Sequence, residues 1–204
     1  MMIDSSPPLV LASRSSARIR MLEAAGLRFD TDSASVDEFE VKEALRAEGV
    51  TAEDTAVALA EIKAERVAVR YGGDVLVLGA DQMLEVEGAW LDKPETVEGL
   101  RRQLLLLRGR KHRLWSAAVL FRSGSRIWHH VAHADLWMRP FSDRFLDEYV
   151  AAVGAEVCQS VGGYHLEGEG AQLFSRISGD FFTILGLPLL PLLQALRDQG
   201  VLKP

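Results

Sequence analysis

The chain has 204 residues, and 48% of them are apolar, which allows a full hydrophobic core and argues against a disordered chain. Its 23 basic and 29 acidic side chains give a formal net charge of −6. A surface of that sign repels phosphate backbones, so we expect no nucleic-acid partner. The single cysteine, Cys158, excludes an internal disulfide and a zinc site built on cysteines.

The chain is predicted to open with a strand and a helix. Residues 9–12 form a short apolar run typical of a buried strand. Residues 13–16 provide capping side chains for a helix that Gly26 would end. The side chains expected to face inward are Ile19, Leu22 and Ala25. A second helix is predicted from Thr51, where Asp54 completes a variant of the capping box.

The rest of the chain alternates strands and helices. Residues 75–80 form an unbroken apolar run, which predicts a strand covered on both faces and ending at Asp81. The later elements are a hairpin at 83–91, a helix from Thr96, strands at 114–122 and 126–138, a helix after Ser142, strands near 171–177 and 181–185, and a closing helix from Pro188 to Gly200. We therefore expect one α/β domain over residues 1–204, with a mixed twisted sheet flanked by helices.

Two stretches bear on location. Residues 1–8 lack a basic region and carry Asp4, so we expect no secretory signal. The longest apolar stretch, residues 181–193, is too short to span a bilayer and contains two prolines. We expect a cytoplasmic protein without a membrane partner.

Asp81 and Glu38 are candidate metal ligands. A carboxylate at the carboxyl end of a buried strand lies where α/β sheets usually bind ligands, although an aspartate there can also merely cap the next turn. Glu38 belongs to the acidic run of residues 36–40, and such runs are usually solvated. Paired with Asp81, Glu38 would form an oxygen-rich site suited to Mg²⁺ or Mn²⁺ beside a polyphosphate.

Two lysines are candidate phosphate ligands. Lys63 shares an apolar helical stripe with Ala56, Leu59, Ala60 and Val67, so it must either extend to solvent or meet an anion. Lys93 precedes a proline and follows the hairpin that starts from Asp81. It could return to the same cleft or lie on a surface loop.

Residues 11–18 form a predicted strand-to-helix turn that carries hydroxyls and arginines. Backbone N–H groups and guanidinium side chains at a helix start bind anions, although the segment lacks the Gly-x-x-x-x-Gly-Lys phosphate loop. The histidines at 129, 130 and 133 lie on a predicted strand. A rise of about 3.3 Å per residue places His129 and His133 roughly 13 Å apart, so we expect them to be structural and not metal ligands.

In this order the segments resemble the Maf family of nucleotide pyrophosphatases over nearly the whole chain. The similar segments are Leu11-Ala12-Ser13-Arg14-Ser15-Ser16-Ala17-Arg18, Val36-Asp37-Glu38, Leu59-Ala60-Glu61-Ile62-Lys63-Ala64, Gly79-Ala80-Asp81-Gln82 with Lys93-Pro94, Leu107-Arg108-Gly109-Arg110-Lys111-His112, and Gly179-Asp180-Phe181-Phe182-Thr183-Ile184-Leu185-Gly186-Leu187-Pro188. The chain departs from the pattern at Ser16, where the family has proline, and at Ala17, where the family often has a basic or aromatic residue.

The resemblance implies an elongated two-lobed fold, similar to that of the ITPases, with a central cleft, and a homodimer. It implies a house-cleaning hydrolase that cleaves a nucleoside triphosphate to the monophosphate and pyrophosphate. With the chemistry above, it implies a divalent cation held by Glu38 and Asp81, with Asp81 also accepting a proton from water. The remaining implied phosphate ligands are Ser13, Arg18, Lys63 and Lys93.

Two further residues resemble the 7-methyl-GTP branch of the family: Gln82, and Glu167 in the Gly-rich segment of residues 162–168. The dTTP/UTP branch typically has threonine and glutamine at these places. A carboxylate only accepts hydrogen bonds, which suits the N1–H and N2–H₂ donors of guanine and a cationic methylated ring. The alternative is that Glu167 simply faces solvent in a loop.

Two other classes of function remain open. One is a nucleotide-binding sensor or cell-division regulator in which catalysis is incidental. The other is a phosphohydrolase that acts on sugar phosphates. Release of pyrophosphate instead of orthophosphate separates the pyrophosphatase from the phosphohydrolase, and a sensor would need no general base.

Overall fold

A computed structural model describes residues 6–203 of the chain. Residues 1–5, part of the segment for which we expect no secretory signal, lie outside the described residues, as does residue 204. The chain divides into two compact units. The first comprises Met1–Asp81, Ser116–Ala132 and Gly186–Pro204, and the second comprises Gln82–Trp115 and His133–Leu185. No helix among the described residues is both long and apolar enough to cross a membrane.

A seven-stranded sheet has the order β2-β1-β3-β5-β6-β7, with β4 paired to β3. The strands are β1 (Leu9–Leu11), β2 (Asp30–Thr31), β3 (Leu76–Val86), β4 (Ala89–Leu91), β5 (Lys111–Arg122), β6 (Ser125–Met138) and β7 (Phe174–Ser178). β1 is parallel to β2 and β3, whereas β4 is antiparallel to β3 and β7 is antiparallel to β6. The predicted α/β fold with a mixed sheet is therefore confirmed, while the cleft between two lobes stays a prediction.

The helices begin largely where the sequence places capping side chains. They are α1 (Ser16–Ala24), α2 (Glu38–Ala47), α3 (Ala52–Ala68), α4 (Val97–Leu107), α5 (Asp143–Val153), α6 (Phe181–Ile184) and α7 (Leu189–Asp198), with 3-10 turns η1 (Glu156–Gln159) and η2 (Glu169–Leu173). A cap side chain that accepts from the backbone N–H three residues on is provided by Ser15, Asp37, Thr51, Thr96, Ser142 and Asp180. Each cap satisfies a donor that the first helical turn leaves unpaired.

The structure differs from several of the expectations for individual elements. The strand expected at residues 181–185 is instead helix α6 (Phe181–Ile184), because Asp180 caps the first turn. Residues 38–47 form helix α2, where only a solvated acidic run over residues 36–40 was expected. The strand expected to end at Asp81 continues to Val86. The strand expected near residues 171–177 begins only at Phe174, after η2.

The inward face of α1 also differs from the prediction. Its buried side chains are Arg18, Met21 and Leu22, so Leu22 faces inward as expected, whereas Ile19 and Ala25 are only partly buried. Ser16, which stands where the family has proline, is the first residue of α1. Proline is favoured at that helical position but is not needed there, so Ser15 still starts the helix at the same place.

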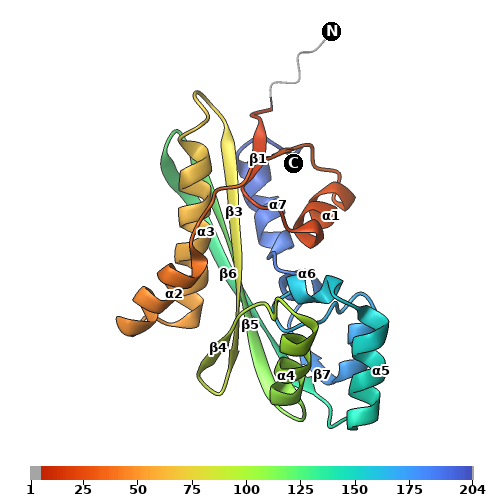
Figure 1. Cartoon of the computed structure of the whole chain (residues 1–204). Coiled ribbons are helices and arrows are strands. Elements are labelled where there is room, and N and C mark those ends of the chain that lie inside the picture. The colour runs from red at the N-terminus through yellow and green to blue at the C-terminus, as the bar shows by residue number, and fades with distance from the viewer. Residues whose placement is uncertain (1–5, 204) are drawn as a thin grey trace. The chain divides into compact units, whose positions relative to one another are not determined.

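In the first unit, α3 lies against β3 (Figure 1). Leu76, Val77 and Leu78 of β3 are at most 1% exposed, which confirms a strand covered on both faces. The predicted apolar stripe of α3 is likewise buried at Ala56, Leu59, Ala60 and Val67. These side chains form the core on which the candidate site rests.

Gly79 allows α3 and β3 to approach closely. A Cβ atom at this residue would lie 2.1 Å from the Ala60 carbonyl oxygen and 2.8 Å from the Ala64 Cβ. The nearest atoms are backbone or the first atom of a side chain, so no rotamer change can relieve the overlap. Glycine in a strand commonly marks such an approach of another backbone.

The second unit has its own apolar core. Helices α4 and α5 contact one another there (Figure 1). Its fully buried side chains include Leu84 of β3, Leu100, Leu104 and Leu107 of α4, and Leu146 of α5. The predicted hairpin is confirmed, since Val86 pairs with Ala89.

We predict that Gly79→Ala lowers the free energy of unfolding by about 1–3 kcal/mol, because overpacked cores pay a cost of that size. Gly72→Ala is the matched control, since a Cβ there would meet no atom within 4 Å, and its stability should stay within about 0.5 kcal/mol of wild type. Urea unfolding followed by circular dichroism measures both. Equal midpoints for the two variants would contradict the close packing of α3 on β3.

Candidate active site

Lys63 bridges two carboxylates in the first unit. Its Nζ atom lies 2.5 Å from Asp81 Oδ1 and 2.6 Å from Glu38 Oε1. The Asp81 side chain is only 6% exposed and that of Lys63 13%, whereas that of Glu38 is 41% exposed. Of the two predicted alternatives for Lys63, the structure therefore shows the contact with an anion. The same contact brings together the two carboxylates that the sequence pairs as metal ligands.

The electrostatic surroundings keep Lys63 charged. Burial by itself lowers the pKa of its ammonium group, but the charges of Asp81 and Glu38, with the hydrogen bond to Asp81, outweigh burial. The pKa therefore lies above the ordinary value of 10.5, even though the nearby Arg18 charge opposes the rise. At neutral pH Lys63 is a cation that donates hydrogen bonds to both acids.

Asp81 has one carboxylate oxygen, Oδ1, that accepts a hydrogen bond from Lys63 and a second, Oδ2, that is unsatisfied. Its Oδ2 atom is buried and accepts no hydrogen bond from the described residues. A buried carboxylate oxygen without a partner is costly, and a cation or a water proton would satisfy it. Asp81 does not cap a turn, since it lies within β3.

The two carboxylates fit a magnesium-type ion better than a closed metal cage. No group of three or more His, Cys, Asp or Glu side chains within residues 6–203 is arranged to hold a metal. Mg²⁺ is commonly held by one or two carboxylates and completes its shell with water and substrate phosphates. Glu38 and Asp81, with the unsatisfied Oδ2, provide that donor set. The histidines at 129, 130 and 133 lie on β6, the strand predicted for them.

Arg18 ties the predicted anion loop to the strand that carries Asp81. Its Nε atom donates to the Gly186 carbonyl at 2.8 Å, and its Nη1 atom donates to the Ala80 carbonyl at 3.0 Å and to Ser13 Oγ at 3.3 Å. Burial lowers the pKa of Arg18, with Asp81 and Glu38 opposing the change, but an arginine stays protonated. Arg18 thus adds positive charge close to Asp81, and its role toward a substrate stays a prediction.

Ser13 lies at the entrance of α1. It is 8% exposed, and its Oγ accepts a hydrogen bond from the Ser15 backbone N–H. Ser15 in turn caps α1 by accepting from the Arg18 backbone N–H. The hydroxyl of Ser13, the helix start and the Arg18 guanidinium are therefore adjacent, which is the arrangement that the sequence predicts for binding a small anion.

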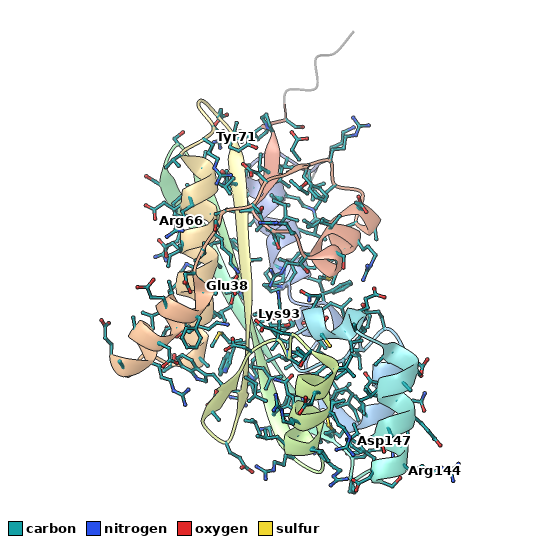
Figure 2. The ribbon with its side chains drawn as sticks, in the orientation of Figure 1. Glu38, Arg66, Tyr71, Lys93, Arg144 and Asp147 are labelled. Carbon is teal, nitrogen blue, oxygen red and sulfur yellow. The ribbon has the colours of Figure 1, made fainter. Side chains whose placement is uncertain are left out.

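The remaining predicted site residues belong to the second unit. Gln82 follows Asp81 on β3, and its Nε2 atom donates to the carbonyls of Thr183 and Ile184 at 3.1 Å each. Lys93 is exposed between β4 and α4 (Figure 2). Glu167 is exposed in a turn before η2. Their predicted roles toward a substrate stay predictions.

The segment that carries Glu167 is held by one buried and one partly buried polar contact that the sequence did not predict. Tyr164 OH lies 2.7 Å from His112 Nε2, and Ser160 Oγ lies 2.7 Å from His165 Nε2. Burial lowers the pKa of His112 to about 4, so the ring is neutral at pH 7. The available signal was the position of His112 at the end of a segment that the chain shares with the family it resembles.

Comparisons with known proteins show which family and which relatives the chain is similar to. The profile of a family described as Maf-like protein matches residues 8–199. A protein of Paramagnetospirillum magneticum named nucleoside triphosphate pyrophosphatase is 53% identical over 195 residues, covering 96% of this chain and 100% of its own. A protein of Rhizobium meliloti named 7-methyl-GTP pyrophosphatase is 47% identical over 196 residues, covering 96% of this chain and 98% of its own.

A solved structure of a HAM1 protein from Coxiella burnetii aligns with 65% of this chain and 73% of its own at 16% identity and a TM-score of 0.39.

We predict that Lys63→Met lowers the free energy of unfolding by about 3 kcal/mol, the lower end of the range for breaking a buried ion pair. The Asp81 carboxylate would then be buried without its partner. Lys63→Met combined with Asp81→Asn should recover much of the loss, because the double variant removes the stranded charge. Arg144→Met is the control, since it breaks an exposed ion pair with Glu148 and should change stability by less than about 1 kcal/mol. Additive effects of the two single changes would argue against the Lys63–Asp81 pair.

Proposed function

The chain belongs to the family of Maf-like proteins, and on that premise we propose that it hydrolyses a nucleoside triphosphate to the nucleoside monophosphate and pyrophosphate. The observation that carries the proposal is the pair of carboxylates, Asp81 and Glu38, joined by Lys63. Acidic side chains would bind the metal form of a triphosphate, and basic side chains beside them would bind its phosphates. This combination suits phosphoryl transfer, in which positioning and charge stabilisation dominate catalysis.

Glu38 and Asp81 would hold a divalent cation such as Mg²⁺ or Mn²⁺. A bound ion of this kind polarises phosphoryl oxygens and offsets the charge of the triphosphate. Asp81 suits this role because its buried Oδ2 lacks a hydrogen-bond partner among residues 6–203.

Asp81 would also accept the proton of the attacking water. The water oxygen forms a bond to the α-phosphorus, the bond from that phosphorus to the β-phosphate oxygen breaks, and pyrophosphate leaves. Lys63 donates a hydrogen bond to Oδ1 of Asp81, and the carboxylate beside the cation would act as the general base for the water. Lys63 remains protonated, so it holds the carboxylate in a fixed orientation while the proton moves.

The phosphate charge would be offset by Ser13 and Arg18 at the start of α1. Each of these two residues is only 8% exposed, so they require little reorganisation when an anion binds. Lys93 would add a second lysine, in line with the Lys-Pro motif that the chain shares with the family. The homodimer implied by the resemblance, and the cytoplasmic location expected from the sequence, are part of the same proposal.

Glu167 and Gln82 would set the preference for the base. Relatives named 7-methyl-GTP pyrophosphatase support a guanine-type base, as in Rhizobium meliloti, and a carboxylate matches the donors of that base. The segment around Glu167 is anchored by the Tyr164–His112 contact, so its backbone can hold a side chain in a defined place. Neither rival class, the sensor or the sugar phosphatase, has an observation of its own in its favour.

We predict that Asp81→Asn lowers the rate of pyrophosphate release at least roughly 10²-fold, as expected when a general base is lost. The shape of the side chain is kept, so the variant should fold. A panel of nucleotides with Mg²⁺, assayed for pyrophosphate and orthophosphate, measures the rates, and excess EDTA should abolish activity in the wild type. Near-normal activity of a folded Asp81→Asn variant would move the base elsewhere, and full activity in EDTA would remove the metal.

Glu167→Gln should reduce the ratio of kcat/KM for 7-methyl-GTP to that for UTP by roughly tenfold or more, because an amide matches the guanine donors less well. The other substrates to compare are GTP and dTTP. Glu169→Gln is the matched control, a nearby exposed acid that should leave the ranking unchanged. A wild-type preference for UTP or dTTP, or an unchanged ranking in Glu167→Gln, would remove Glu167 from the account of specificity.

A further inference from the structure

Glu38 occupies a position that its own helix does little to stabilise. It is the first residue of α2, and none of the α2 side chains is buried. A helix without a buried face gains little from packing. The place of the Glu38 carboxylate must therefore be determined by contacts outside α2.

Those contacts come from three basic side chains, two on α3 and one in the turn that follows it. Lys63 contacts Glu38, Arg66 donates from Nη1 to the Ser35 carbonyl, and Arg70 donates from Nη1 to the Ser33 carbonyl at 3.3 Å. Lys63 and Arg66 are three positions apart and so share one side of α3, whereas Arg70 lies in the turn that follows the end of the helix at Ala68.

The three basic residues contact the segment 32–38 in the reverse of their order along the chain. Arg70 binds the start of the segment 32–38, Arg66 its middle and Lys63 its end (Figure 2 labels Glu38 and Arg66). A single exposed arginine on a helix is an ordinary surface feature. Three successive contacts in this order instead hold the whole segment along α3 and the turn that follows it.

Both ends of the segment are also attached elsewhere. The Asp32 backbone N–H donates to the Leu11 carbonyl at 3.1 Å, which ties the start to β1. Arg70 Nη1 lies 2.7 Å from Asp32 Oδ1, and this hydrogen bond is the main reason why the pKa of Asp32 lies below its ordinary value. At the other end, Asp37 accepts from the Glu40 backbone N–H and starts α2.

We propose that Arg66 and Arg70 are positioning residues that hold Glu38 in place to bind a divalent cation with Asp81. The inference rests on the proposed metal role of the two carboxylates. Neither arginine contacts the metal or the substrate. They restrict the backbone of residues 32–38, so less freedom is lost when Glu38 binds the ion.

The test is Mn²⁺ binding to the full chain, measured by the electron paramagnetic resonance signal of free Mn²⁺ without nucleotide. Arg66→Met should weaken Mn²⁺ binding roughly three- to tenfold, the range that one intramolecular hydrogen bond contributes. Arg66→Lys should recover part of the affinity, because an ammonium group can still donate to the Ser35 carbonyl. Arg70→Met provides a second variant, with weaker binding expected for the same reason.

A matched control is Arg126→Met. Arg126 on β6 forms an ion pair with Glu61 on α3, with 2.7 Å between Nη1 and Oε2, and its loss leaves the segment 32–38 untouched. It should bind Mn²⁺ as the wild type does. The melting temperatures of all the folded variants should stay close together, because exposed contacts stabilise little. In activity assays, Arg66→Met should require more Mn²⁺ for half-maximal rate, with kcat restored at saturating metal.

Wild-type affinity for Mn²⁺ in both Arg66→Met and Arg70→Met would overturn the positioning role while leaving the metal site in place. An equal loss in Arg126→Met would overturn it as well, since the effect would then belong to α3 in general. If the wild type itself bound no Mn²⁺, the proposed metal site would fail, and the inference with it.

Discussion

The ammonium group of Lys63, placed between Asp81 and Glu38, is the interaction on which the site depends. Two acids this close would repel one another without a cation between them, and burial of Asp81 would make the repulsion costly. The lysine can reach Asp81 only because α3 lies close to β3. That closeness requires Gly79, whose missing side chain leaves room for the backbone at Ala60. A packing constraint in the core thus determines the charge arrangement of the site.

The first unit also places the guanidinium group of Arg18 near the carboxylates of Asp81 and Glu38. Arg18 is buried in α1 and bonded to the carbonyls of Ala80 and Gly186, so the strand residue before Asp81 is linked to two other segments of the chain. Although the chain carries a net charge of −6, Arg18 and Lys63 balance the charges of Asp81 and Glu38 here and provide two cations beside them. A negatively charged protein can in this way provide sites for the phosphates of a nucleotide.

Much of the site could be predicted from the sequence because its signals are local. A lysine inside an apolar helical stripe, as at Lys63, must either extend to solvent or meet an anion, and an aspartate directly after an apolar run, as at Asp81, lies where such sheets usually bind ligands. The helix at Glu38 was also detectable, since Asp37 and Glu40 have the spacing of a capping box. The density of acids in that run favoured a solvated loop instead.

What could not be predicted depends on residues far apart in the chain. The role of Gly79 requires knowing that Ala60 lies opposite, and the contacts of Arg66 require the course of the loop before α2. Residues 181–185 show the limit of short apolar runs, which are as common in helices as in strands. Only the cap at Asp180 distinguishes the two, and its hydrogen bond to Thr183 is a property of the folded chain.

The most direct test of the central claim is the position of Mn²⁺ in crystals grown with a triphosphate whose α,β bridging oxygen is replaced by a methylene group. Anomalous scattering identifies the ion without reference to its ligands. The account predicts one ion bonded to carboxylate oxygens of both Glu38 and Asp81 and to the phosphates. An ion bonded to the phosphates alone, with Asp81 still paired only to Lys63, would contradict it.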